Sequence, residues 1–370
     1  ISENPLLITA ALNGKADEWE TYLRYDDYEE VDIYIFVDAY FAFDTVYVDQ
    51  FGDLWTNTLM VDLDVELTGI PSVPRFVGSA IGLASDLIYE VHMTIPEECD
   101  LTGAYMQFDI SDGTSQTVLL EDASEYTDAY AFCCYLNPLQ LGDTITVTFY
   151  WANGEQSITD TCSGAGYCYS IIDSDFYSQN YPDMQVLAKA LLAYSYYLAG
   201  SGWTDGHIHQ GVVLPDGMTI SEDEFVQILG DLEQYKADID LEGTGIKQIM
   251  YSLSLTQSTK IKVYALPEDG VVPSYCDLGT KQFGDDTYYI YQSYEVGPAG
   301  LGEEQEIWIP IEHQEEYGTA LYIAPLAYAY SFMKQSTDTN KKLAMAAFYK
   351  YYTSVVDYNN SWNVDNEEGE

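Results

Sequence analysis

The chain has 370 residues, of which 47% are hydrophobic, and its 61 acidic against 13 basic side chains give a formal net charge of −48. This charge argues against nucleic acids and anionic membrane surfaces as partners, because both are bound largely through lysine and arginine. The 35 tyrosines, 13 phenylalanines and 6 tryptophans exclude the composition of a disordered chain, and no apolar run is long enough for membrane insertion.

Residues 1–71 are predicted to form a separate β-rich region. The chain starts at Ile1 with neither an initiator methionine nor a signal peptide, as expected of a processed, secreted protein. Apolar side chains are concentrated between Val31 and Val48. The candidate assembly residues there are Ile33, Ile35, Val37, Phe41 and Phe43. These strands pair either within their own chain or with another copy, which would give a homo-oligomer or a filament.

Residues 72–205 are predicted to combine alternating strands with a terminal helix. From Leu87 to Ile95 apolar and polar side chains alternate, which is the pattern of a strand buried on one face. The strand Ile145–Trp151 runs into Asn153-Gly154, a dipeptide that suits a tight hairpin turn. Apolar residues then recur at helical spacing from Leu187 to Leu198, and Gly200 ends this pattern.

Residues 206–244 are predicted to be a connector with one short helix, because Ser221 and Glu224 have the spacing of a capping box. Residues 245–370 then combine strands and helices again. One helix is expected near Pro325 and another from Leu343 to about Val356.

The elements of residues 72–205 recur in the same order in residues 245–370. The matched segments are residues 77–91 with 249–263, at a spacing of 172, Pro138 with Pro298, and Ala190–Tyr194 with Ala347–Tyr351, at a spacing of 157. Loops of unequal length account for the change in spacing, and the shared order predicts a tandem duplication. The expected fold class is mostly β with α-helical hairpins: tandem antiparallel β-sandwich modules, each closed by a helical hairpin.

The helical segments carry the motifs A-L-L-x-Y at residues 190–194, P-L-x-Y-x-Y at 325–330 and A-F-Y-x-Y-Y at 347–352. In these motifs, residues 72–363 resemble an uncharacterised repeat module of large secreted surface proteins from anaerobic Gram-positive bacteria. The resemblance implies a modular architecture and an extracellular or cell-surface location, with no established activity. Such helices usually carry small residues after the motif tyrosine, whereas this chain has Ser195-Tyr196-Tyr197.

Six cysteines are present without any C-x-x-C pair, which argues against zinc-ribbon, thioredoxin and c-type haem sites. Cys162 and Cys168 bracket a glycine-containing loop and are the candidate disulfide pair. The alternative is that the cysteines are small buried hydrophobic residues.

No nucleotide-binding glycine loop, nucleophile elbow or H-E-x-x-H motif occurs. Asp205, His207 and His209 are candidate metal ligands, because alternate residues of an extended segment share a face. Asp173 and Asp175 are candidates for calcium, although no complete calcium-binding loop is present. The alternative for all five is an ordinary solvated loop, and no cofactor other than calcium is expected.

These observations predict a non-catalytic extracellular structural or adhesive surface protein, which self-assembles into a fibre if its strands pair between copies. The second hypothesis is a carbohydrate-binding or cell-adhesion module, since exposed tyrosine and tryptophan stack on sugar rings, although such residues also fill cores and interfaces. A glycan-active hydrolase is the third hypothesis, because two carboxylates in a cleft suffice for that chemistry.

Overall fold

The computed structural model describes residues 73–83, 87–97, 99–126, 129–255, 258–311 and 317–367, together with four two-residue strands in the segment before them. The chain divides into two units, Ile1–Ser72 and Val73–Glu370. In the first, β1 (Val37–Asp38) pairs with β4 (Thr58–Leu59), and β2 (Tyr47–Val48) pairs with β3 (Leu54–Trp55). Of the assembly candidates, Ile33, Ile35, Phe41 and Phe43 lie outside the described residues, and Val37 belongs to β1.

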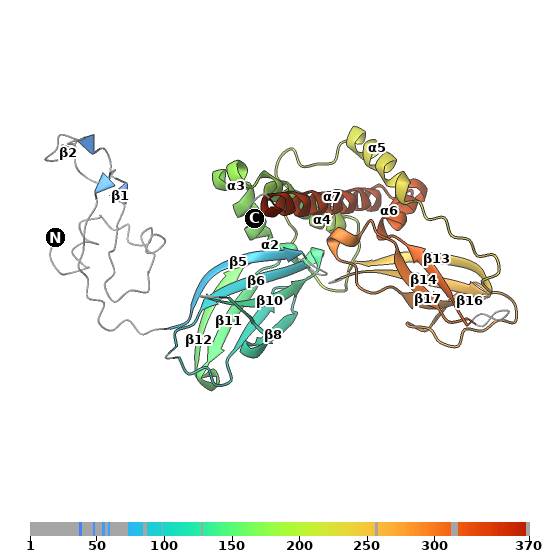
Figure 1. The fold of residues 1–370 in the computed structure, drawn as a ribbon, viewed down its shortest axis with the longest axis horizontal. Coiled ribbons are helices and arrows are strands. Elements are labelled where there is room, and N and C mark those ends of the chain that lie inside the picture. The colour runs from blue at the N-terminus through green and yellow to red at the C-terminus, as the bar shows by residue number, and fades with distance from the viewer. Residues whose placement is uncertain are drawn as a thin grey trace. The chain divides into compact units, whose positions relative to one another are not determined.

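The second unit begins with two four-stranded antiparallel sheets (Figure 1), with strand orders β5-β6-β10-β9 and β12-β11-β7-β8. The strands are β5 (Arg75–Leu83), β6 (Leu87–Thr94), β7 (Tyr105–Ile110), β8 (Ser115–Leu119), β9 (Ser124–Glu125), β10 (Tyr130–Leu136), β11 (Ile145–Trp151) and β12 (Gln156–Cys162). Buried and partly exposed residues alternate along β6, as its sequence predicts. The inner faces of the sheets meet, since the rings of Phe132 on β10 and Phe149 on β11 lie 5.7 Å apart.

Three helices follow these sheets: α2 (Gly164–Ile172), α3 (Asp175–Asn180) and α4 (Pro182–Gly200). The hydroxyl of Ser163 accepts a hydrogen bond from the backbone N–H of Gly166 and so caps α2. α4 begins with Pro182, whose fixed φ suits the first helical turn. The face of α4 that carries Leu187, Leu191 and Leu198 is buried, as the spacing of these residues predicts.

The connector between α4 and the next sheet contains α5 (Glu222–Asp231). The predicted capping box is present, since Ser221 and Glu224 each bind the other's backbone N–H through their side chains. The chain before α5 lies along α2, because the hydroxyl of Tyr169 donates to the carbonyl of Val213 at 2.7 Å. That hydroxyl also accepts from the N–H of Val213 at 2.9 Å.

The last part of the chain forms a four-stranded sheet, β13-β14-β16-β15, a two-stranded hairpin and two helices. These elements are β13 (Ile246–Leu255), β14 (Thr259–Pro267), β15 (Thr280–Phe283), β16 (Asp286–Gln292), β17 (Gln305–Ile309), β18 (Thr319–Ile323), α6 (Pro325–Gln335) and α7 (Thr339–Glu367). The strand pair β13–β14 has the register of β5–β6. Tyr251 is paired with Val263, as Ser79 is with Val91.

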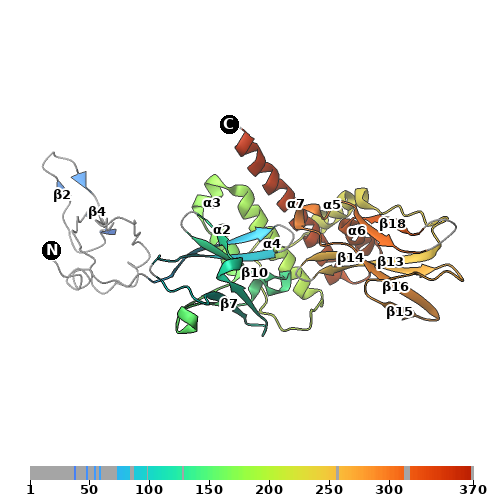
Figure 2. The same ribbon diagram turned by 60° about the horizontal axis from the view of Figure 1, so that its bottom comes forward.

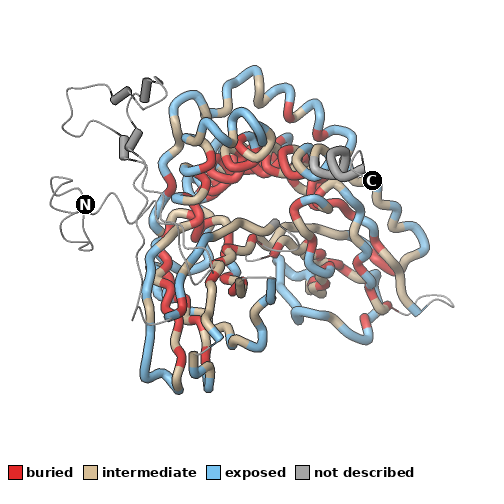
Figure 3. The backbone as a smooth tube through the Cα atoms, turned by 60° about the vertical axis from the view of Figure 1, so that its left-hand side comes forward, coloured by how far each residue is buried: buried red, intermediate tan, exposed pale blue. Residues whose placement is uncertain are grey.

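The helices α4 and α7 pack against each other (Figure 2) and join the two sets of sheets. The rings of Tyr194 on α4 and Tyr351 on α7 stack at 5.5 Å with an interplanar angle of 14°. Phe348 lies 5.4 Å from Tyr194 on the same interface. One hydrophobic core therefore runs from the first pair of sheets through α4 and into α7. Figure 3 shows long runs of buried residues along the helices and shorter ones interspersed along the strands.

Helix and strand make up comparable shares of the described residues, about 35% and 34%. The expected antiparallel sheets and helices are present, but the strands do not predominate as the term "mostly β" implies. Part of the difference is α7, which runs from Thr339 to Glu367 instead of ending near Val356. No described helix is both long enough and apolar enough to cross a membrane.

Candidate functional site

Three loops that are distant in the sequence meet beside the first pair of sheets. They are residues 111–114 between β7 and β8, residues 137–144 before β11, and residues 203–211 after α4. Gly113 and Gly206 have φ angles of 92° and 97°, which allow the first and third loops to turn sharply. In the second loop, the side chain of Asn137 caps the short helix Pro138–Gly142.

His209 lies at the centre of the three loops with a carboxylate on each ring nitrogen. Its Nδ1 lies 2.7 Å from Oδ2 of Asp143, and its Nε2 lies 2.9 Å from Oδ1 of Asp205. Oδ2 of Asp112 is 3.7 Å from the same Nδ1. The side chains of Asp112 and Asp143 are inaccessible to solvent, and that of His209 is only 10% exposed. We call these four residues the His209 cluster.

The second oxygen of each carboxylate in the His209 cluster is held by neutral donors. Oδ1 of Asp112 accepts from the backbone N–H and the hydroxyl of Thr114, at 2.8 and 2.6 Å. Oδ1 of Asp143 accepts from the backbone N–H of Gln210 at 2.6 Å. These bonds fix the carboxylates of Asp112 and Asp143 so that the Oδ2 atom of each lies toward His209 Nδ1.

Two side-chain amides from the second loop complete this hydrogen-bond network. Gln140 donates through Nε2 to Oδ2 of Asp112 at 2.7 Å, and Asn137 donates through Nδ2 to Oδ2 of Asp205 at 2.8 Å. Both amides lie in or beside the capped helix Pro138–Gly142, whose capping box holds them in place. The cluster therefore fastens the chain after α4 to two loops of the preceding sheets.

The electrostatic environment favours the charged form of three groups of the cluster. Burial alone would raise the pKa of Asp112, but the hydrogen bonds from Thr114 and Gln140 outweigh it and hold this pKa below its usual value. The pKa of Asp205 is lowered against the effect of burial by its hydrogen bonds with His209 and the His207 backbone. Burial opposes protonation of His209, but the carboxylates of Asp143 and Asp205 outweigh this effect and raise its pKa.

The structure brings together two of the three predicted ligands on the 205–209 segment. Asp205 and His209 are in contact, whereas the exposed ring of His207 has its centroid 6.4 Å from that of His209. The expectation that His207 shares a face with His209 is wrong for a physical reason. The segment bends at Gly206, and the backbone N–H of His207 bonds to Oδ1 of Asp205, so the segment is not an extended strand.

The other predicted site residues do not belong to the cluster. Asp173 and Asp175 are exposed at the junction of α2 and α3. Cys162 and Cys168 are not bridged in the structure. The thiol of Cys162, at the end of β12, donates to the carbonyl of Ile145 at 3.7 Å, while Cys168, a residue of α2, is buried in the core.

Sequence reasoning missed Asp112 and Asp143, the two aspartates of the cluster whose side chains are closed to solvent. Asp112-Gly113 was interpretable as a turn, and Asp143 lies in a loop without any metal-binding motif. The available signal was indirect. An aspartate followed two residues later by threonine, as at Asp112 and Thr114, forms a local turn that orients the carboxylate.

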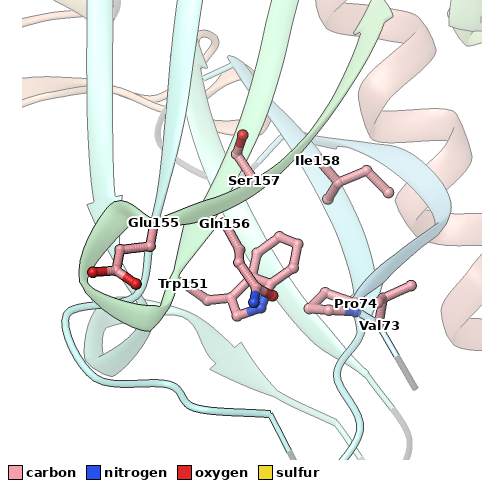
Figure 4. A pocket seen from close by; sticks show the side chains of 7 residues that line it. All are labelled: Val73, Pro74, Trp151, Glu155, Gln156, Ser157 and Ile158. Atoms are coloured by element: carbon pink, nitrogen blue, oxygen red, sulfur yellow. The ribbon is translucent and has the colours of Figure 1, made fainter. Parts of the chain in front are cut away.

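A separate surface pocket lies between Pro74 and Trp151 (Figure 4). Its lining is apolar apart from three residues, of which Glu155 is the only titratable one. Asp112, Asp143 and His209 of the His209 cluster, in contrast, are a group in the described part of the chain that could hold a metal ion. Comparison of the chain with protein-family models, with curated proteins and with solved structures found no match.

Proposed function

We propose that the chain is a non-catalytic structural or adhesive module of a cell surface, made of two duplicated β modules that their helices hold in a fixed arrangement. The observation that carries this proposal is the stacking of Tyr194 on Tyr351 in the middle of the α4–α7 contact. The rest of the chain supports it in three ways.

First, the order and register of the elements support a duplication. Each half begins with a strand pair, later has a short 3-10 helix that begins at a proline, continues through a further strand pair and ends in helices, counting β12 and β18 as equivalents. In the described part of the chain, the first half has four strands between its first pair and this 3-10 helix and three final helices, and the second half has two of each. From the pair Gly78–His92 to the pair Leu83–Leu87, the paired residues of β5–β6 correspond to those of β13–β14 under the single spacing of 172. The expected β-sandwich in each half is supported by the first pair of sheets, whereas the second half has the hairpin β17–β18 in place of a second four-stranded sheet.

Second, the contact between the halves is of the kind formed by a symmetric dimer. Tyr194 and Tyr351 are equivalent positions of the two sequence motifs, and they touch each other. Equivalent residues meet in this way at the axis of an isologous interface. The two modules would thus behave as an internal dimer with a fixed spacing, which suits a spacer or a scaffold.

Third, the hairpin β17–β18 supports assembly by strand pairing. β11 is hydrogen-bonded to β12 on one side and β7 on the other, but β17, at the corresponding place, is paired only with β18 among the described strands. Its buried Ile307 and Ile309 alternate with the exposed Trp308, as in a strand that covers a core. We propose that residues 31–48 of another copy add to this edge and join the chains as a fibre.

Electron microscopy and light scattering of the purified chain, with and without Ca²⁺, test the assembly. Filaments or large oligomers are expected, and Ile35→Asp should dissociate them because a charge then lies on the apolar face of the donor segment. A monodisperse monomer at high concentration would rule out the fibre.

Glycan binding is the second candidate function, and a specific surface favours it. Trp308 and Tyr322 are 52% and 53% exposed. They lie on the same face of the β17–β18 hairpin, because Tyr322 is paired with Glu306, which is two residues from Trp308 on the same strand. Stacking on sugar rings requires such exposed aromatic planes. A glycan array with Trp308→Ala tests this, and Tyr126→Ala, at a position 54% exposed in the other half, is the control.

A further inference from the structure

The His209 cluster contains more negative charge than its own groups neutralise. Three carboxylates surround one imidazole, so even a protonated His209 leaves −3 + 1 = −2. In the described part of the chain, the other donors that reach these carboxylates are neutral amides, hydroxyls and backbone N–H groups. Because Asp112 and Asp143 are withdrawn from solvent, this charge is costly unless a cation balances it.

The hydrogen bonds also orient one atom of each residue toward a common point. Nε2 of His209 lies 2.9 Å from Oδ1 of Asp205, so the ring keeps a carboxylate partner on this nitrogen when Nδ1 gives up its proton to bind a cation. Nδ1 faces the Oδ2 atoms of Asp112 and Asp143, at 3.7 and 2.7 Å, and a metal cation there would take the place of the proton that Nδ1 shares with Asp143. A carboxylate that holds the far nitrogen of a histidine is the usual support of a metal-binding imidazole.

We infer that Asp112, Asp143 and His209 bind a divalent transition-metal cation of the zinc type, with Asp205 as the residue that positions the histidine. The three ligand atoms lie within 4.8 Å of one another. A tetrahedral site with metal–ligand bonds of about 2.1 Å needs ligand atoms about 3.4 Å apart, so small side-chain movements suffice.

The donor set selects this class of cation against calcium. Calcium takes about six to eight oxygen ligands, whereas the cluster offers one imidazole nitrogen and two carboxylate oxygens. Nitrogen and oxygen donors in this number match zinc with a water molecule in the fourth position. The inference thus differs from the calcium that the sequence left open, and of the candidate ligands found in the sequence it keeps His209 as a ligand and Asp205 as its support, without His207, Asp173 and Asp175.

A cation at this point would tie three loops together. Residues 203–211 begin the connector to the second half, and the cation would anchor them to the loops at 111–114 and 137–144. Binding to the folded state alone stabilises that state, by an amount that grows with the ratio of free metal to the dissociation constant. The expected effect of the cation is therefore on the stability of the folded chain, and the inference stands independently of the proposed surface function.

Calorimetric titration of chelator-treated protein with Zn²⁺ and with Ca²⁺ tests the inference. One Zn²⁺ is expected per chain, with no measurable heat from Ca²⁺. Asp112→Asn and Asp143→Asn should each abolish Zn²⁺ binding, while Asp205→Asn should weaken it about 10–100-fold. Asp173→Asn, which changes an exposed carboxylate outside the cluster, should bind as the wild type does.

Circular dichroism shows whether each variant is folded, and an anomalous difference map of zinc-soaked wild-type crystals locates the ion without any variant. A peak between His209 Nδ1 and the two carboxylates supports the inference. No Zn²⁺ binding by the wild type, a peak elsewhere, or unchanged affinity in folded Asp112→Asn and Asp143→Asn would overturn it.

Discussion

Replacing Tyr351 by alanine tests whether the two halves of the unit are held together by their helices. Tyr351 is 5% exposed, and its ring stacks on that of Tyr194, which is 2% exposed. Truncation of a fully buried aromatic side chain costs about 3–5 kcal/mol, because apolar contacts are lost and a cavity remains. Tyr351→Ala should therefore lower the free energy of unfolding by about that amount, and Tyr194→Ala should do the same.

The pair also has a coupling energy that can be measured separately. Stacked aromatic rings contribute about 0.5–1.5 kcal/mol beyond the area they bury, so the double variant should lose less than the sum of the single variants by that amount. Urea unfolding followed by circular dichroism gives all three values. Tyr196→Ala is the matched control, since Tyr196 lies on the same helix but is 43% exposed, and it should cost less than about 1 kcal/mol.

Hydrogen exchange read by mass spectrometry distinguishes a shared core from two independent modules. If the halves share one core, Tyr351→Ala reduces the protection of α4 and β6 as well as that of α7. If only residues 245–370 lose protection, or if the coupling energy is zero, then the stacked pair does not join the halves and the proposed spacer loses its basis.

Three further outcomes are expected. A Cβ at Gly142 would overlap the carbonyl oxygen of Gln210, so Gly142→Ala should lower the free energy of unfolding by about 1–3 kcal/mol and make residues 203–211 sensitive to protease. Gly200→Ala is the control, because a Cβ there meets no neighbour, and it should have neither effect. Burial raises the pKa of Cys168 to about 12, so iodoacetamide at about pH 8 should label this thiol only after unfolding, and rapid labelling of the native protein would contradict its burial. Burial also raises the pKa of Tyr351 above its usual 10.0, so ionisation of this side chain should leave stability unchanged below that pH. Above it, stability should fall by about 1.4 kcal/mol per pH unit per buried tyrosine, and less steeply in Tyr351→Phe. A flat profile between pH 10 and 11 in urea titrations would refute this.

Local patterns in the sequence predicted the parts of this fold whose stability is local. Alternation predicted β6, because a strand with one buried face needs an apolar side chain at every second position. Ser221 and Glu224 predicted the start of α5, because both ends of the capping box lie within one helical turn. The periodic apolar residues of α4 likewise predicted its buried face.

The features that sequence reasoning missed depend on distant partners. α7 continues past Val356, where no local signal extends the predicted helix. Asp112 and Asp143 come together only because β7 is paired with β11. This pairing brings the loop after β7 next to the loop before β11. His209 was found beside Asp205, its neighbour in sequence, whereas Asp112 and Asp143, which face its Nδ1, come from elsewhere in the fold.

The pairing of α4 with α7 also affects how the protein is made. During synthesis α4 leaves the ribosome roughly 150 residues before the helix that covers Tyr194, a delay on the order of ten seconds at the usual rate of translation. Until then the apolar side of α4 has no partner from its own chain, and a neighbouring nascent copy could supply the same helix. The first half of the unit thus has a period of vulnerability to mispairing that ends only when the C-terminal helix is complete.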